Sequence, residues 1–230
     1  MFKIFNVKND SLNPAYNLAL EEYLCSLGQE VFMLWSNEPS IILGRFNDVN
    51  QCVDVDECRN SNVNIVRRNS GGGAVYHDLG NINYSFILHD KKIYSLSFFA
   101  DIVIKILYDI GINGSLEFTH NDIMLDGSKI SGTAQYHHNN IILHHGTLLF
   151  DSDLSMIQKL LRRSGRVTNI RPALRHELNI SEFMNKLRDN IGGEFMTLTQ
   201  EQIQRVNDLM QRKYLNPKWN MEGILNHDRV

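Results

Sequence analysis

Residues 67–81 are the feature that most limits what this chain can fold into and bind. They read Arg-Arg-Asn-Ser-Gly-Gly-Gly-Ala-Val-Tyr-His-Asp-Leu-Gly-Asn. Three consecutive glycines remove every side chain from the path of a ligand, allow φ > 0 and leave successive N–H groups free to converge on an anion. Apolar residues at 64–66 and 73–77 predict a strand on either side, so the glycines join two strands and do not open a helix.

This placement excludes two familiar phosphate-binding motifs. A P-loop needs Gly-Lys-Ser/Thr running into a helix, and a dinucleotide fingerprint needs spaced glycines at a helix start. Neither pattern is present in the sequence. On the glycines alone, a hairpin loop flanked by two solvated arginines explains the stretch as well as a ligand site does.

Residues 121–132 predict a β-hairpin, because Asp126-Gly127 is the favoured two-residue turn between strands. Asn121 and Asp122 begin one strand and Lys129 lies on the other. Pairing of the strands therefore brings oxygen ligands and an ammonium group into the same sheet. On composition alone, such a lysine is most often a solvated charge at a sheet edge.

Both stretches resemble the lipoate–protein ligase A family. The matching patterns are Arg-Arg-x-Ser-Gly-Gly-Gly-Ala-Val-Tyr-His-Asp-Leu-Gly-Asn and Asn-Asp-x-x-x-Asp-Gly-x-Lys-Ile-Ser-Gly-Thr-Ala-Gln, and the likeness runs through about Asn220. Members activate lipoate with ATP to lipoyl-AMP and pass the lipoyl group to a lysine of a carrier domain. The resemblance implies one α+β catalytic domain over residues 1–230, with a mixed or antiparallel sheet and helices on its outer face, like class II biotinyl and lipoyl ligases.

The resemblance also implies roles for the motif residues. Lys129 is expected to be catalytic, bridging the lipoate carboxylate and the α-phosphate. Arg68 is expected to hold phosphate as a fork, and Asp122 with Asn121 to place Mg²⁺. An apolar slot that includes Val75 and Tyr76 is expected to take the lipoyl chain. The residues expected to bind ATP or lipoyl-AMP are Arg68, Ser70, Gly71, Gly72, Gly73, Ala74, Val75, Tyr76, His77, Asn121, Lys129, Arg166, Val167 and Thr168.

Three assignments keep alternatives. His77 could orient the backbone or contact the ligand. The basic loop 162–169 could be a surface linker, whereas the resemblance implies that it closes over the adenylate. Gly44-Arg45 follows a predicted strand and is expected at the rim of the site, although a solvated loop arginine is equally common.

Capping and periodicity predict the remaining elements. Asn13 and Pro14 begin a helix that Gly28 ends, and an apolar stripe over 95–110 predicts a second helix ended by Gly111. Asp153 caps a third that runs through Leu160, and two more begin near Asn179 or Ser181 and at Thr199. Strands are expected at 31–35, 40–43, 141–150 and 82–88, the last with one buried face. Tyr214–Asn220 is expected to pack back on the sheet.

Composition narrows the class of protein. A length of 230 residues with 43% hydrophobic content allows a large core, and a net charge of −3 argues against nucleic acid as a partner. No apolar run approaches the ~20 residues that span a bilayer, and no secretory signal is evident, so we expect a cytoplasmic protein without a membrane partner. Three cysteines without a close pair favour reduced thiols. A metal site at His137, His138, His144 and His145 is disfavoured, because adjacent histidines on a strand point to opposite faces.

The expected partners are lipoyl carrier domains of 2-oxo acid dehydrogenase complexes and the glycine cleavage H-protein. Because the chain stops at Val230, we expect no C-terminal accessory domain within it, and a separate accessory polypeptide is one alternative. A lipoyl or octanoyl transferase and a non-catalytic adenylate- or carrier-binding module also stay open. A Cys-dependent transferase is disfavoured, because no cysteine follows Cys58, and a biotin ligase lacks support because no Gly-Arg-Gly-Arg loop occurs. The sequence leaves lipoate and octanoate undistinguished.

Overall fold

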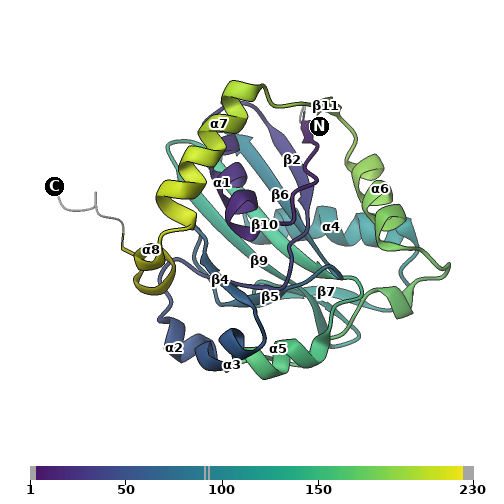
Figure 1. Ribbon diagram of the computed structural model, residues 1–230. Helices are drawn as coiled ribbons and strands as arrows, with labels where there is room; N and C mark the ends of the chain where they lie inside the picture. The colour runs from purple at the N-terminus through teal and green to yellow at the C-terminus, as the bar shows by residue number, and fades with distance from the viewer. Residues whose placement is uncertain (1–3, 91, 93, 225–230) are drawn as a thin grey trace.

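The computed structural model describes residues 4–90, 92 and 94–224, and places two β-sheets against each other (Figure 1). The larger sheet has eight strands in the order β11-β1-β2-β6-β10-β9-β8-β7, and the smaller has the order β4-β3-β5. In the larger sheet β1 pairs in parallel with β2 and β11, whereas the pairs from β2 through β7 are antiparallel. The α+β class and the mixed sheet predicted from the sequence are confirmed.

The elements have the following bounds. The strands are β1 (Phe5–Val7), β2 (Val31–Trp35), β3 (Ser40–Leu43), β4 (Asn64–Arg67), β5 (Val75–His77), β6 (Asn81–His89), β7 (Leu116–Thr119), β8 (Asp122–Leu125), β9 (Ser128–His138), β10 (Ile141–Leu149) and β11 (Glu194–Met196). The helices are α1 (Pro14–Cys25), α2 (Val49–Cys52), α3 (Val55–Asn60), α4 (Leu96–Ile110), α5 (Leu154–Leu160), α6 (Ile180–Ile191), α7 (Gln200–Leu209) and α8 (Pro217–Glu222), with a 3₁₀ turn at Arg171–Ala173 and a π turn at Met210–Tyr214.

Helices cover both faces of the larger sheet (Figure 1). α4 and α6 bury the face that carries Phe32 and Phe86, whereas α1 and α7 bury the face that carries Met33 and Ile87. Successive strand residues point to opposite faces, so both sets of side chains become core. Within the described ranges, no helix is long and apolar enough to cross a membrane.

The predicted helix starts are confirmed, and one predicted end is wrong. Asn13 caps α1, Asp153 caps α5, and both Asn179 and Thr199 form capping boxes with the third residue of their helices. α1 ends at Cys25 and not at Gly28, because the Ser26 hydroxyl and N–H both donate to the Tyr23 carbonyl and close the last turn. Gly28 follows in the turn to β2.

The prediction that residues 82–88 bury one face was also wrong. Asn81, Asn83 and Ser85 are as buried as the apolar residues between them, because α1 covers the second face. The indole N–H of Trp35 donates to Ser85 Oγ and Asn81 Nδ2 donates to Asn83 Oδ1, both at 3.0 Å, so each of these three side chains has a partner inside the protein. Buried polar groups of this kind are stable only when hydrogen-bonded.

The glycines do join two strands, as predicted, but those strands are not neighbours. β3 lies between β4 and β5, parallel to the first and antiparallel to the second. The glycine loop, residues 68–74, therefore crosses the end of β3 and is not a hairpin. It passes so close that a Cβ at Gly44 would lie 2.1 Å from the Gly72 carbonyl oxygen, and the Arg45 N–H donates to Ser70 O at 2.8 Å.

Two arginines close to this loop, Arg67 and Arg45, contact the C-terminal segment. Arg67 is almost fully buried and donates to backbone carbonyls of Gly44, Asn47, Trp219 and Met221. The Trp219 indole N–H donates back to Arg67 O at 2.8 Å. Arg45 was expected at the rim of the ligand site, but it does not line the cavity described in the next subsection. Its guanidinium lies 4.3 Å from the Trp219 ring centroid. The predicted packing of 214–220 is thus confirmed.

We expect Trp219→Ala to lower the free energy of unfolding by about 3–5 kcal/mol, because the fully buried indole fills the space between α8 and β4 and leaves a cavity when it is truncated. Urea denaturation measures the change. Phe46→Ala is the matched control, since Phe46 is 85% exposed and its loss should shift stability by no more than about 0.5 kcal/mol. Equal effects of the two substitutions would contradict the packing described.

Candidate active site

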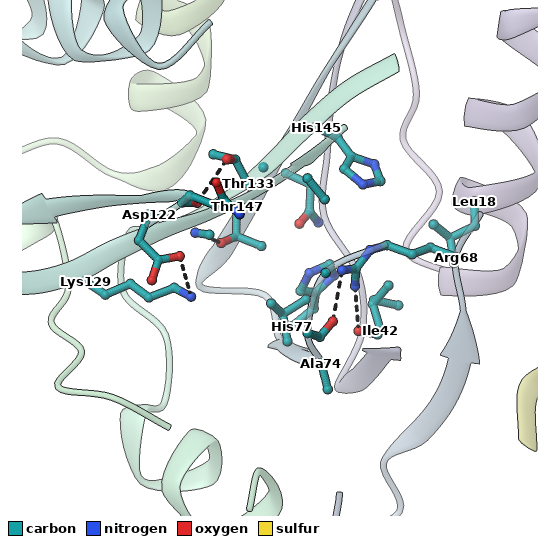
Figure 2. Close-up of a pocket in the computed structure, with 18 of the residues that line it drawn as sticks. Leu18, Ile42, Arg68, Ala74, His77, Asp122, Lys129, Thr133, His145 and Thr147 are labelled. Atoms are coloured by element: carbon teal, nitrogen blue, oxygen red, sulfur yellow. Dashed lines mark hydrogen bonds and ion pairs between the residues drawn. The ribbon is translucent and has the colours of Figure 1, made fainter. Parts of the chain in front are cut away.

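A cavity of about 170 Å³ opens between the two sheets, with the glycine loop as one wall and β9 and β10 as the other (Figure 2). Leu18, Trp35 and Ile42 make one part of its lining apolar. Figure 2 shows Lys129 and Asp122 on the opposite side from Leu18 and Arg68. The cavity thus extends from an apolar part, beside the buried Arg68, to the Lys129–Asp122 pair.

The structure brings most of the predicted site residues to this cavity. Those that line it are Arg68, Gly72, Gly73, Ala74, Val75, His77, Asn121, Asp122 and Lys129. Ser70 and Gly71 belong to the same loop but do not line the cavity. Val75 lines this cavity but Tyr76 does not, because alternate residues of β5 face opposite sides and Tyr76 packs with Ile41 and Leu43.

Tyr76 and Val75 together line a second, smaller cavity of about 70 Å³, so the predicted apolar slot for the lipoyl chain stays a prediction. Arg163, Ser164, Gly165 and Val167 of the basic loop form its other wall. The two cavities share four lining residues, Ala74, Val75, Lys129 and Thr147. Lys129 therefore stands where the two cavities meet.

The hairpin places Lys129 against Asp122, as the sequence predicted. Lys129 Nζ lies 2.9 Å from Asp122 Oδ1, and both side chains are about 70% covered. A register shift in β8 between Ile123 and Met124 adjusts the strands around this pair. Gly132 gives the lysine room, since a Cβ there would lie 2.9 Å from Nζ.

The loop at 166–168 runs beside the same lysine. The Lys129 N–H donates to Arg166 O at 2.9 Å and the Thr168 N–H donates to Lys129 O at 3.0 Å. These bonds pair Val167 with Lys129 as a short parallel bridge. The backbone of the loop is therefore registered on the lysine. Its predicted closure over an adenylate stays a prediction.

Arg68 shapes the glycine loop from inside. Its guanidinium donates to Ser70 Oγ, Ile42 O, Gly71 O and Gly73 O at 2.6–3.0 Å. Burial lowers the pKa of Arg68 to about 10, so the group stays charged at neutral pH. Because most of its N–H groups are used on the loop, the phosphate fork predicted for Arg68 has few donors left and stays a prediction.

Sequence reasoning missed a buried pair behind the loop. His145 Nδ1 lies 2.9 Å from the carboxylate of Glu21, and its Nε2 lies 2.6 Å from Ser70 Oγ. His144 points to the other face and stacks on Phe99 with ring centroids 4.4 Å apart, so the adjacent histidines diverge as predicted. The available signal was Glu21 itself, a charged residue on a helix face that buries Leu18 and Leu24. Across the described residues, no cluster of three or more His, Cys, Asp or Glu side chains could hold a metal.

The chain is similar to proteins named for one activity. Lipoate–protein ligase 1 of Staphylococcus aureus is 34% identical over 238 aligned residues, which cover 94% of this chain and 72% of that protein. Lipoate-protein ligase LplJ of Bacillus subtilis is 32% identical, with coverage of 93% and 72%. Among solved structures, a lipoate protein ligase of T. acidophilum with bound lipoic acid has a TM-score of 0.86 at 26% identity, covering 96% of this chain and 99% of that one. Lipoate-protein ligase A bound with ATP has a TM-score of 0.82 at 25% identity, covering 97% and 99%.

The family model described as the lipoyl protein ligase A/B catalytic domain matches residues 13–192, a span that runs from the cap of α1 to the end of α6 and contains both cavities. With the glycine loop, the Lys129 hairpin and these relatives in agreement, the chain belongs to the lipoyl protein ligase A/B catalytic domain family.

Proposed function

We propose that this chain is an ATP-dependent lipoate–protein ligase that acts as one catalytic domain. It activates lipoate to lipoyl-AMP and transfers the lipoyl group to a lysine of a carrier domain. The observation that carries the proposal is the pair of cavities that meet at Lys129. The larger one suits an acyl chain with a polar head, and the smaller one, bordered by the basic loop, suits a nucleotide. Two similar proteins, one with bound lipoic acid and one with bound ATP, support the choice of these two ligands.

Positive charge at the junction of the cavities is what the first reaction needs. A carboxylate oxygen attacks the α-phosphorus of ATP, a P–O bond forms, and pyrophosphate leaves. Two anions must approach each other in this step, so catalysis consists mainly of positioning and charge stabilisation. The Lys129 ammonium lies between the two sites and can contact both anions.

The same lysine can serve the second reaction. The amine of the carrier lysine attacks the carbonyl carbon of the mixed anhydride, an amide forms and AMP leaves. The glycine loop offers backbone N–H groups without side chains near the acyl-adenylate, because Gly73 has open space where a side chain would lie. Val75, on the cavity face of β5, would contact the lipoyl chain.

Mg²⁺ fits the oxygen ligands at the open side of the larger cavity. Asn121 and Asp122 both line it, and the Asp122 side chain keeps 29% of its surface exposed. Mg²⁺ commonly takes one or two carboxylates together with substrate phosphates and water. We propose that Asp122, with Asn121, would hold the ion, which would neutralise phosphate charge when bound.

The competing activities have less support. A Cys-dependent acyl transferase needs a thiolate at the site, but Cys25, Cys52 and Cys58 do not line the larger cavity. Burial raises the pKa of the Cys25 thiol above its ordinary range and that of Cys58 to about 11, which disfavours a nucleophilic thiolate. A silent binding module would bind lipoate and ATP without pyrophosphate exchange, which an exchange assay detects directly.

The carrier and the place of action follow from the proposed activity. Lipoyl domains of 2-oxo acid dehydrogenase complexes and the H-protein are the proposed acceptors, and the cytoplasm is the proposed location. We also propose that a separate polypeptide assists adenylation. A bi-partite lipoate protein ligase of Thermoplasma acidophilum has a chain with the same fold, at a TM-score of 0.88 and 23% identity, and it supports such an arrangement.

We expect Lys129→Ala to reduce lipoyl-AMP formation by about a hundredfold or more, because the transition state loses the cation between its two anions. Pyrophosphate exchange dependent on lipoate measures this step. Lys105→Ala is the control, since Lys105 forms an exposed helical ion pair with Asp109 and should change nothing. Wild-type exchange in Lys129→Ala would remove the catalytic assignment.

We expect Gly72→Ala to weaken the binding of lipoate and ATP by about tenfold. Gly72 has φ +87°, and a Cβ there would lie 2.9 Å from Arg68 Nη2, so the substitution strains the loop and displaces its central arginine. Calorimetry with each ligand measures the effect. Gly192→Ala is the control, because Gly192 also has a positive φ, +72°, with open space at its Cβ position, but lines neither cavity. If both variants bind normally, the loop geometry does not govern binding.

We expect the purified chain to transfer the lipoyl group from supplied lipoyl-AMP to a carrier domain much faster than it makes lipoyl-AMP from lipoate and ATP. Ordering the exposed loop over the adenylate has an entropic cost, which a second protein surface could offset. The two half-reactions should be assayed separately. Full-rate synthesis by the chain alone would rule out the need for a second polypeptide.

A further inference from the structure

A chain of hydrogen-bonded asparagine side chains leads from Asn9, just before α1, to His77. Asn9 Nδ2 donates to Asn17 Oδ1 at 2.8 Å, and Asn17 Nδ2 lies 2.9 Å from Asn37 Oδ1. Asn37 Nδ2 then lies 3.0 Å from His77 Nδ1. Asn17 and Asn37 are fully buried, and His77 is nearly so. Each amide in this line constrains the orientation of the next.

The direction of these bonds fixes the tautomer of His77. Asn17 Nδ2 also lies 2.9 Å from Ser11 O and 3.0 Å from Ser36 O, and a backbone carbonyl can only accept. The nitrogen of Asn17 is therefore placed without ambiguity, and its two hydrogens are shared among these two carbonyls and Asn37. Because an amide nitrogen does not accept a hydrogen bond, the atom that Asn37 presents to it is the oxygen. The nitrogen of Asn37 must then face His77 and donate to Nδ1. A neutral imidazole that accepts at Nδ1 carries its proton on Nε2.

This Nε2–H is a buried donor without a hydrogen-bond partner among the described residues. Burial lowers the pKa of His77 to about 3, and the nearby Arg68 guanidinium acts in the same direction, so the ring stays neutral. An unmet buried donor is costly and needs an explanation, and a ligand in the adjoining cavity would supply one.

The location of His77 indicates which part of the ligand would meet this donor. His77 lines the larger cavity (Figure 2). Val75, two residues earlier on β5, lines it as well. Its ring packs edge-on to Trp35 with centroids 5.9 Å apart, in the apolar part of the lining. Under the proposed function the lipoate carboxylate lies at Lys129, so the group near Trp35 and His77 is the distal part of the acyl chain.

We propose that the Nε2–H of His77, fixed by the relay of Asn17 and Asn37, donates to a ring sulfur of lipoate and makes the cavity select lipoate over octanoate. Sulfur is a weak acceptor, but a plain alkyl tail offers none and leaves the donor unpaired. The inference rests on the proposed function, and it assigns His77 to substrate contact and Asn37 to positioning.

The tautomer is read directly from the ¹⁵N shifts of the His77 ring. The wild-type protein should show a protonated Nε2 and an unprotonated Nδ1. Asn37→Asp should put the proton on Nδ1, because a carboxylate can only accept there. Asn9→Ala is the control and should leave the wild-type pattern, since Asn17 keeps both backbone acceptors. A protonated Nδ1 in the wild-type protein would overturn the proposal.

Selectivity is measured as the ratio of lipoate to octanoate affinity by calorimetry. His77→Gln keeps an N–H donor near the Nε2 position, whereas His77→Asn keeps one near Nδ1, and His77→Phe keeps none. We expect the Gln variant to retain the ratio and the Asn and Phe variants to lower it by about tenfold, through lipoate alone. General damage to the fold would affect both acids and leave the ratio unchanged.

The proposal fails if both acids bind to wild-type protein and His77→Phe leaves their ratio unaltered. The proposed function fails in a different way, with neither acid bound or activated by wild-type protein. Addition of lipoate, but not octanoate, should also shift the Nε2 resonance of wild-type His77, and an equal response to the two acids would contradict a sulfur contact.

Discussion

The site depends on the hydrogen bonds that the Arg68 guanidinium donates to its own loop. Arg68 stands at the start of the glycine loop and donates to the carbonyls of Gly71 and Gly73 further along it. A stretch of three glycines has large conformational freedom in the unfolded chain, and only specific contacts hold it in one conformation. The buried arginine supplies these contacts from the protein interior. The glycines on the cavity side of the loop therefore have no side chain that would block a ligand.

The loop is held from its outer side as well. Lys213, in the π turn after α7, lies 2.8 Å from Glu22 and 2.5 Å from Asn69, which follows Arg68 in the loop. Arg67 and Trp219 add bonds between β4 and α8. Segments 140 and more residues apart in the sequence thus converge on one loop. Displacement of the C-terminal helix would reach the ligand cavity through Asn69 and Arg67, because both are bonded to that helix region and adjoin Arg68.

The sequence predicted the local features better than it predicted which of them meet. Caps at Asn13 and Asp153, and the hairpin that pairs Lys129 with Asp122, depend on interactions within a few residues, and the structure has them. The burial of Ser85 and the separation of β4 from β5 depend on contacts with α1 and β3, which are distant in the sequence. No periodicity within a single strand carries that information. The same reason explains why the pairing of Glu21 with His145 was missed.

The two cations that line the larger cavity, Lys129 and Arg68, each have a carboxylate nearby. The ammonium of Lys129 is paired with Asp122, and the cation of Arg68 lies near the Glu21 carboxylate, whose charge acts on it. These pairs let the protein hold cations in a mostly covered site before any ligand arrives, since an unpaired buried charge would be far more costly. When lipoate and ATP enter, their negative charge exceeds what one lysine can offset. Arg163, in the wall of the smaller cavity, is placed to add positive charge where we propose that the nucleotide binds. The cationic groups are thus divided between Arg68, buried behind the loop, and Arg163, at the second cavity. This division limits the cost of burying charge in the protein, and it leaves positive charge where the anions would react.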